Sequence, residues 1–411
     1  MFDWLDAQLE PGTFKYVTPD TDLSGFDKVL ILGKSALYSL RPDLSFQRVR
    51  GQFITPNMMA TFSPLDVTEY REDYDADGVD INPTTYRAWI SRDLHKLLNW
   101  KPDTLDNFAV DFNIGRLIDL LRTARNTNIF LDIECTREMA LTVVGLAVGD
   151  SPVYPIRVIG NGLYYSRFPE LLAVLTKALQ RNTVVCHNAM FDLVVLAMFY
   201  HIPTGPRIYD TMLVHHRFEP ELEKSLGHAI SWWTTLPYHK DQGIVEPKNE
   251  AQWRQLLHYN ALDVYGMRLV YERQQAEMRP EVALSAKQAC DSIYPYLVAT
   301  LHGLPVDESR LLASQGILSR RIKQLTRIVK IMSCGMIENP NSAQQCANFF
   351  FDWAGYKPLR FTDTGRPAFS QDEIFKICSQ NPHPIFGVIA ECREAAKELS
   401  MLKFTPYPGV L

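Results

Sequence analysis

The chain has 411 residues, of which 46% are apolar and 22% charged, with a formal net charge of −5. This composition predicts two or three globular domains, and no apolar stretch reaches the roughly 18 residues of a membrane-spanning helix. A net negative charge disfavours nucleic-acid binding over the whole surface, although a local basic strip would be enough for binding at one site. Seven cysteines without a C-x-x-C pair favour reduced thiols over disulfides or a zinc site. We therefore expect a cytoplasmic protein without membrane contact.

The N-terminal part alternates short apolar runs with Gly- and Pro-containing turns. This pattern predicts strands at 29–32 and 58–62 and a helix at 35–40. An acidic, turn-rich stretch at 70–78 predicts a solvated loop before a helix near 86–99. We therefore expect an α/β module, which ends at a Pro-containing polar segment near residue 104.

Residues 105–280 have the pattern of a mixed α/β domain. A helix predicted at 114–126 leads into a strand at 128–134, with neighbouring strands at 140–148 and 153–158. Helices and strands then alternate to the end of this region, an order typical of α/β folds.

Three short segments of this domain supply four carboxylates and a tyrosine: Asp132 and Glu134, then Asp192, then Tyr259 and Asp263. The first two residues end the predicted strand, where positions i and i+2 lie on one face of a sheet. The pairs Asn188 and Asp192, and Tyr259 and Asp263, are each four residues apart in predicted helices. Each pair is therefore expected to share a helix face.

These residue types suit phosphodiester hydrolysis, which needs stabilised charge on both the attacking and the leaving oxygen. Two divalent cations roughly 4 Å apart meet both needs, and Mg²⁺ or Mn²⁺ prefers oxygen ligands. We therefore predict that Asp132, Glu134, Asp192 and Asp263 bind two such cations. The hydroxyl of Tyr259 would hold the attacking water, since an ordinary tyrosine pKa near ~10 suits an orienting group better than a strong base.

In order and spacing these residues resemble the DEDD nuclease superfamily in its tyrosine subclass. The surrounding sequence is similar to the proofreading domain of family-A, polymerase-I-like DNA polymerases, which implies a ribonuclease H-like fold. The resemblance implies that Asp132, Glu134 and Asp263 bind the first metal and that Asp132 bridges to the second. It also implies that Asp192 holds the second metal through water and that Tyr259 orients the nucleophile.

The resemblance continues along the chain, at residues 210–227 between the second and third motifs, and in thumb-like segments at 296–307, 339–345, 362–367 and 391–399. It implies a mainly helical thumb-like region over 281–411. We expect no palm or fingers on this chain and hence no nucleotidyl transfer by it alone. The expected setting is a split or truncated polymerase of phage type in the host cytoplasm, with a separate palm-and-fingers chain as possible partner.

The N-terminal module, residues 1–104, resembles the latter half of uracil-DNA glycosylase domains at 29–37, 48–51 and 60–64. Ser63-Pro64 stands where an active glycosylase of that type has His-Pro. The resemblance therefore implies a degenerate module without glycosylase activity.

Candidate contacts to a DNA 3′ end or primer-template are Asn188 and Phe191 in the second motif. A predicted amphipathic helix at 318–330 adds a basic strip that consists of Arg320, Arg321, Lys323, Arg327 and Lys330. Its charges could follow a phosphate backbone, or could be a solvated helix face. Trp232 and Trp233 could stack on a base or fill the core, and core is favoured for one of them.

The sequence thus predicts a metal-dependent 3′-to-5′ DNA exonuclease that proofreads a primer terminus and releases nucleoside monophosphates. One alternative is an RNA-trimming exonuclease of the same superfamily. Another is a DNA-binding or assembly subunit of a polymerase whose nuclease site is vestigial.

Overall fold

The computed structural model describes residues 3–10, 13–64, 83–103, 105, 108–158, 168–237, 239–361, 367–380 and 382–403. The chain forms two compact units, Met1–His302 and Gly303–Leu411. The loop predicted at 70–78 and residues 362–366 of the thumb-like signature lie outside the described residues. Among the helices that are described, none is long and apolar enough to cross a membrane. All seven cysteines are free.

The N-terminal part of the first unit contains a three-stranded sheet in the order β1-β3-β2. Its elements are α1 (Asp3–Asp6), β1 (Val29–Leu32), α2 (Lys34–Leu40), α3 (Phe46–Val49), β2 (Phe53–Thr55), β3 (Met58–Thr61) and α4 (Pro83–Asn99). Strand β3 runs parallel to β1 and antiparallel to β2. The predicted strands and helices of this part are confirmed. The sequence pattern missed β2 and α3, because runs of three and four residues are too short to show a period.

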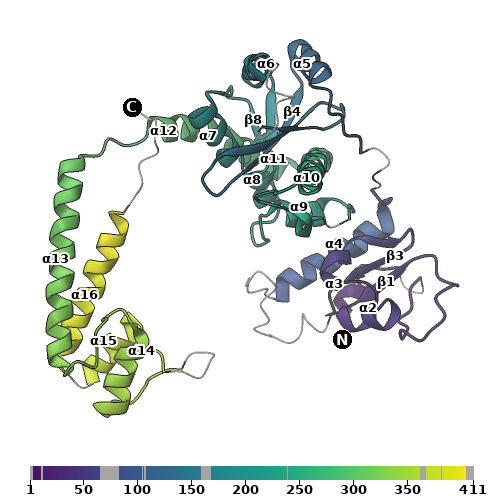
Figure 1. The fold of residues 1–411 in the computed structure, drawn as a ribbon. Helices are drawn as coiled ribbons and strands as arrows, with labels where there is room; N and C mark the ends of the chain where they lie inside the picture. The colour runs from purple at the N-terminus through teal and green to yellow at the C-terminus, as the bar shows by residue number, and fades with distance from the viewer. Residues whose placement is uncertain are drawn as a thin grey trace. The chain divides into compact units, whose positions relative to one another are not determined.

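The larger part of the first unit is built on a five-stranded sheet in the order β6-β5-β4-β7-β8. Its strands are β4 (Asn128–Cys135), β5 (Leu141–Val148), β6 (Tyr154–Arg157), β7 (Thr183–Cys186) and β8 (Ile208–Asp210). Figure 1 labels strands β4 and β8 of this sheet. Strand β4 runs antiparallel to β5 and parallel to β7. The described residues thus form a mixed α/β fold, and the predicted strands from 128 to 158 are confirmed.

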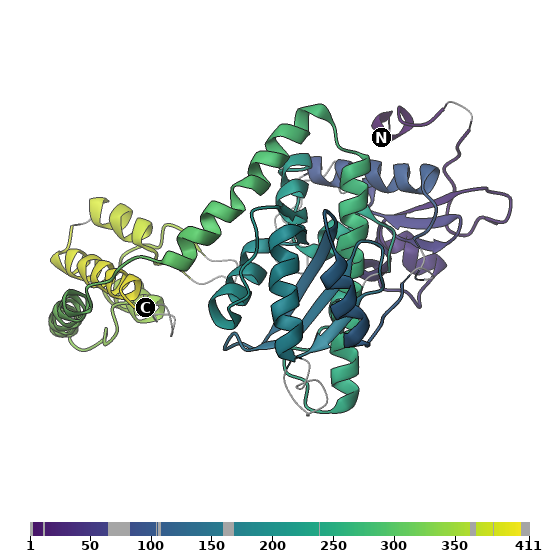
Figure 2. The same ribbon diagram turned by 90° about the horizontal axis from the view of Figure 1, so that it is seen from above.

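The helices of this part are α5 (Ile114–Thr123), α6 (Phe168–Arg181), α7 (Ala189–Tyr200), α8 (Thr211–Phe218), α9 (Leu226–Trp233), the 3₁₀ turn η3 (Lys240–Gln242), α10 (Glu250–Ala276), α11 (Pro280–Asp291) and α12 (Ile293–His302). Helix α5 precedes the strands of this part in the chain, and the other helices lie between or after the strands. Helices α11 and α12 belong to the first unit by their contacts, and Ile293 and Leu297 of α12 join the core beside α7. Figure 2 shows the same helices around the sheet from above.

The two faces of strand β4 meet different helices. Ile129, Leu131 and Ile133 are buried in the core formed with α5, α6 and α7. The alternate residues point to the opposite face, where Phe130 joins the core that contains α10. Because Asp132 has the same parity as Phe130, the strand presents its carboxylates to α10.

A buried polar cluster joins helix α4 to helix α9. The side chain of Lys96 is fully buried, and its Nζ donates hydrogen bonds of 2.7 Å to the carbonyl oxygens of Gly51 and Ser231. The same ammonium lies 3.1 Å from the carboxylate of Asp93, which is also fully buried. The N-terminal part is thus joined to the larger part by buried hydrogen bonds and an ion pair, whose groups would be costly to bury without these partners.

The second unit is helical in its described residues. Its elements are α13 (Glu308–Met332), α14 (Ala343–Ala347), a π-helical segment η4 (Asn348–Trp353), α15 (Gln371–Gln380) and α16 (Pro384–Met401). Helices α13 and α16 run side by side (Figure 1), and a core that includes Phe350, Phe386 and Ile389 lies at one end. The predicted helix at 318–330 is confirmed as part of α13.

Candidate metal centre

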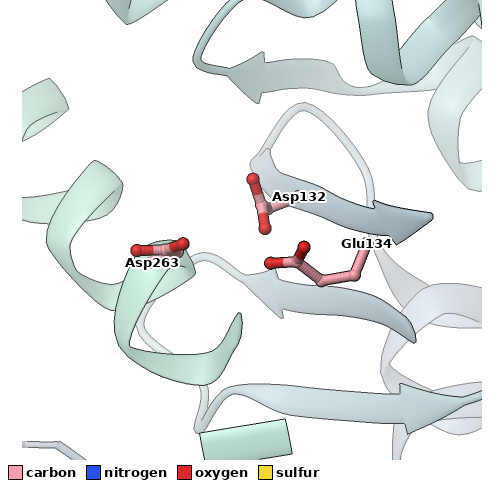
Figure 3. A group of neighbouring side chains, drawn as sticks. All are labelled: Asp132, Glu134 and Asp263. Atoms are coloured by element: carbon pink, nitrogen blue, oxygen red, sulfur yellow. The ribbon is translucent and has the colours of Figure 1, made fainter. Parts of the chain in front are cut away.

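Three carboxylates from two elements converge on the face of β4 that meets α10. Asp132 and Glu134 come from the strand and Asp263 comes from the helix, and one oxygen of each lies within 4.8 Å of the others. The three side chains point toward one another (Figure 3). We call these three residues the carboxylate triad. Their close approach is the arrangement that can hold a metal ion.

A glycine on the neighbouring strand lets helix α10 come this close. Gly145 of β5 pairs with Asp132, and a Cβ at Gly145 would overlap the side chain of Asn260 and lie 2.7 Å from Val264. The amide of Asn260 instead fits over the strand and donates a 2.8 Å hydrogen bond to Asp132 Oδ2. Asn260 thus orients a triad carboxylate. Sequence reasoning missed this role, and the only signal was its place beside Tyr259.

Asp192 lies at the edge of the same strand. Strand β7 pairs with β4 only as far as Phe130, so the later N–H groups on that edge have no strand partner. The buried Asp192 accepts a 3.0 Å hydrogen bond from one of them, the N–H of Ile133. Its carboxylate is therefore bound to the residue between Asp132 and Glu134, although Asp192 is not part of the triad. Burial raises the pKa of Asp192 well above its ordinary value.

A residue of strand β8, Asp210, fixes the start of helix α7 through hydrogen bonds. Asp210 accepts hydrogen bonds from the N–H groups of Asn188 and Ala189, and it also caps its own helix α8. Asn188 is the residue before α7 and has a left-handed backbone with φ of 67°. The prediction that Asn188 shares a helix face with Asp192 is therefore wrong. Asn188 and Phe191 are both exposed at this helix start.

Asp263 is held by two side chains that sequence reasoning missed. His239 Nε2 lies 2.8 Å from Asp263 Oδ1, and Lys240 Nζ donates a 2.7 Å hydrogen bond to Asp263 Oδ2. The same ammonium lies 4.8 Å from the ring centroid of Tyr259. No local spacing links these residues to the motifs, because the contacts span more than one element.

The electrostatics of the triad favour a bound cation. Burial, reinforced by Asp263, raises the pKa of Asp132 well above its ordinary value and that of Glu134 to about 7. Burial acts in the same direction on Asp263, but His239 and Lys240 outweigh it and hold its pKa below the ordinary value. Two partly buried acids thus resist ionisation until positive charge is nearby. An all-oxygen donor set of this kind fits a hard divalent cation.

The raised pKa of Glu134 should make the unfolding free energy of the metal-free protein depend on pH. A folded-state pKa of about 7 against 4.5 means that its stabilising contribution is complete below about 4.5 and is lost as the pH rises through 7. In EDTA, we expect wild type to lose up to about 3 kcal/mol of unfolding free energy relative to Glu134→Gln over this range. Urea denaturation at several pH values would measure it, and a constant difference between the two proteins would contradict it.

The other candidate contact residues belong to the second unit. Arg320, Lys323 and Arg327 are exposed on α13. The two remaining members of the basic strip are paired within the second unit, Arg321 with Glu391 of α16 and Lys330 with Glu338.

Trp232 and Trp233 are only 4% and 1% exposed. Both fill the core, and the base-stacking alternative is therefore wrong for both.

No family model and no curated protein sequence matches the chain. Among solved structures it is similar to the POL domain of Pol1 from M. smegmatis in complex with DNA primer-template and dNTP, at 15% identity and a TM-score of 0.49. That likeness covers 70% of this chain and 47% of the other, so the chain spans about half the length of the one it matches. It is also similar to the apo form of a nuclease, at 20% identity and a TM-score of 0.34, over 44% of this chain and 84% of that one. At TM-scores below 0.5 neither likeness supports a conclusion about function. The function is therefore inferred from the side chains of the site.

Proposed function

We propose that this protein is a divalent-cation-dependent exonuclease that shortens DNA from its 3′ end. The observation that carries the proposal is the carboxylate triad, with its oxygens within 4.8 Å of one another. Asp192 lies at the edge of the strand that carries two triad members, and Tyr259 lies one helical turn from Asp263. All five residues of the sequence motif are thus grouped around one strand and two helices.

In this proposal the triad and Asp192 would hold two cations. When bound, these would supply acidity to the attacking water and offset charge on the leaving oxygen. Tyr259 orients that water. Burial and the nearby Asp263 raise the pKa of Tyr259 above its ordinary value, so its hydroxyl stays protonated and acts as a hydrogen-bonding group. Asn260 and Lys240 keep two of the carboxylates in place.

The substrate contacts are proposed from exposed side chains. Asn188 and Phe191, at the start of α7, would contact the terminal nucleotides. The exposed Arg320, Lys323 and Arg327 of α13 would contact backbone phosphates, which makes binding salt-dependent.

The domain assignment follows the family resemblance. We propose that residues 1–104 are a degenerate glycosylase-like module, that 105–280 are a ribonuclease H-like nuclease, and that 281–411 are thumb-like. Proofreading as part of a split or truncated family-A polymerase, with a separate palm-and-fingers chain as possible partner, is the proposed setting.

A single-stranded DNA oligonucleotide with a 5′ label tests the proposed function. With Mg²⁺ or Mn²⁺ we expect a ladder of products that shorten from the 3′ end, and EDTA should abolish it. A matched RNA oligonucleotide should be degraded more slowly. Faster degradation of RNA would instead favour the RNA-trimming alternative, and DNA binding without cleavage under any of these conditions would favour a vestigial site.

A further inference from the structure

The 3₁₀ turn η3 (Lys240–Gln242) brings a lysine into the nuclease site. The turn is fixed at its end, where the side chain of Gln255 of α10 donates a 2.9 Å hydrogen bond to the carbonyl oxygen of Gln242. Lys240 reaches from this turn to Asp263 Oδ2 at 2.7 Å and lies over the ring of Tyr259 at 4.8 Å. One side chain thus contacts both the triad carboxylate of α10 and the tyrosine one turn before it.

A glycine in helix α9 makes room for this lysine. Gly227 lies in the first turn of α9, and a Cβ there would be only 2.9 Å from Lys240 Cγ. Glycine is a poor residue for a helix, where alanine would be favoured by about 0.5–1 kcal/mol. Its presence at this contact therefore provides space for Lys240 at the expense of helix propensity.

We propose that Lys240 is a positioning residue of the nuclease site, which holds Asp263 and Tyr259 in one fixed arrangement. This inference rests on the proposed function. The ammonium of Lys240 also shares Asp263 with any cation bound at the triad. Because like charges repel, Lys240 weakens cation binding while it keeps the ligand and the water-orienting hydroxyl aligned.

Kinetics on single-stranded DNA test the positioning role. We expect Lys240→Ala to lower kcat about 10- to 100-fold with KM unchanged, the range seen when residues behind a metal ligand are removed. Lys240→Arg should recover most of the loss, because it keeps the charge and hydrogen-bond donors. Lys248→Ala is the matched control, since Lys248 is an exposed lysine in the same connecting segment. An unchanged kcat in Lys240→Ala would overturn the proposal.

A double-mutant cycle with Gly227 separates positioning from general damage to the fold. Gly227→Ala should displace Lys240 and lower kcat, although alanine favours the helix and should not lower the unfolding free energy. In the Lys240→Ala background the Cγ that it would meet is gone, so Gly227→Ala should have no further effect. Losses that simply multiply in the double variant would contradict a shared mechanism.

Mn²⁺ affinity gives a readout that needs no turnover. By electron paramagnetic resonance of DNA-free protein, we expect Lys240→Ala to bind Mn²⁺ about tenfold more tightly than wild type, because a positive charge beside the triad is removed. Lys240→Arg should bind as wild type does. If wild type degrades no DNA, the proposed function fails, and the Mn²⁺ measurement still decides the role of Lys240. Unchanged or weaker Mn²⁺ binding by Lys240→Ala would contradict it.

Discussion

Replacing Asp132 by asparagine is expected to lower the rate of metal-dependent DNA degradation about 1,000-fold, because bound cations supply several kcal/mol of transition-state stabilisation. Asn has nearly the shape of Asp but lacks the charge, and Asp132 is the triad member with the most carboxylate neighbours acting on it. The fold should be retained. In EDTA the unfolding free energy should not fall, since one of several repelling charges is gone.

The Asp132→Asn measurement is the initial rate on a 5′-labelled oligonucleotide, together with urea denaturation of the same samples. Asp150→Asn is the control, because Asp150 is an exposed aspartate in the turn after β5. It should retain full activity. A rate for Asp132→Asn within tenfold of wild type, with the protein folded, would show that catalysis does not depend on the triad.

The second large effect is expected at the junction between α4 and α9. Lys96→Met should destabilise the first unit by about 3–5 kcal/mol, the usual result of removing one member of a buried ion pair. The substitution leaves the carbonyl oxygens of Gly51 and Ser231 without their donor and removes the ammonium beside Asp93. Because the cluster joins the two parts, we expect them to unfold in one transition in wild type.

The pH dependence of this effect has a defined sign. Burial lowers the pKa of Lys96 to about 8 from 10.5, against the opposing effect of Asp93. Between these values the unfolded chain binds more protons than the folded one, so the advantage of wild type over Lys96→Met should grow as the pH rises from 8 toward 10.5. Urea denaturation measures it, with the exposed Lys101→Met as control. Equal unfolding free energies of Lys96→Met and wild type would contradict the stabilising role of Lys96 between α4 and α9.

The sequence pattern predicted the main features of the carboxylate triad where local spacing determines geometry. The alternation in β4 places Asp132 and Glu134 on one face, and the third motif places Asp263 on a helix that packs against that face. Periodicity did not reveal the left-handed backbone of Asn188, which is set by hydrogen bonds to Asp210 from another strand.

Other parts of the site depend on contacts between distant segments. Asp192 meets β4 because strand β7 ends early, and a motif does not record where a neighbouring strand stops. Lys240 reaches Asp263 because a turn outside any motif lies against α10. Trp232 and Trp233 illustrate the same limit, since their burial depends on how α9 packs rather than on the pair itself.

Anomalous diffraction from crystals soaked in Mn²⁺ shows directly whether the carboxylate triad binds a cation, because it locates the cation without relying on activity. We expect manganese peaks at coordination distance from the carboxylate oxygens of Asp132, Glu134 and Asp263, and their loss in Asp132→Asn. Absence of manganese at these oxygens, in protein that degrades DNA in the same Mn²⁺ buffer, would contradict cation binding by the triad.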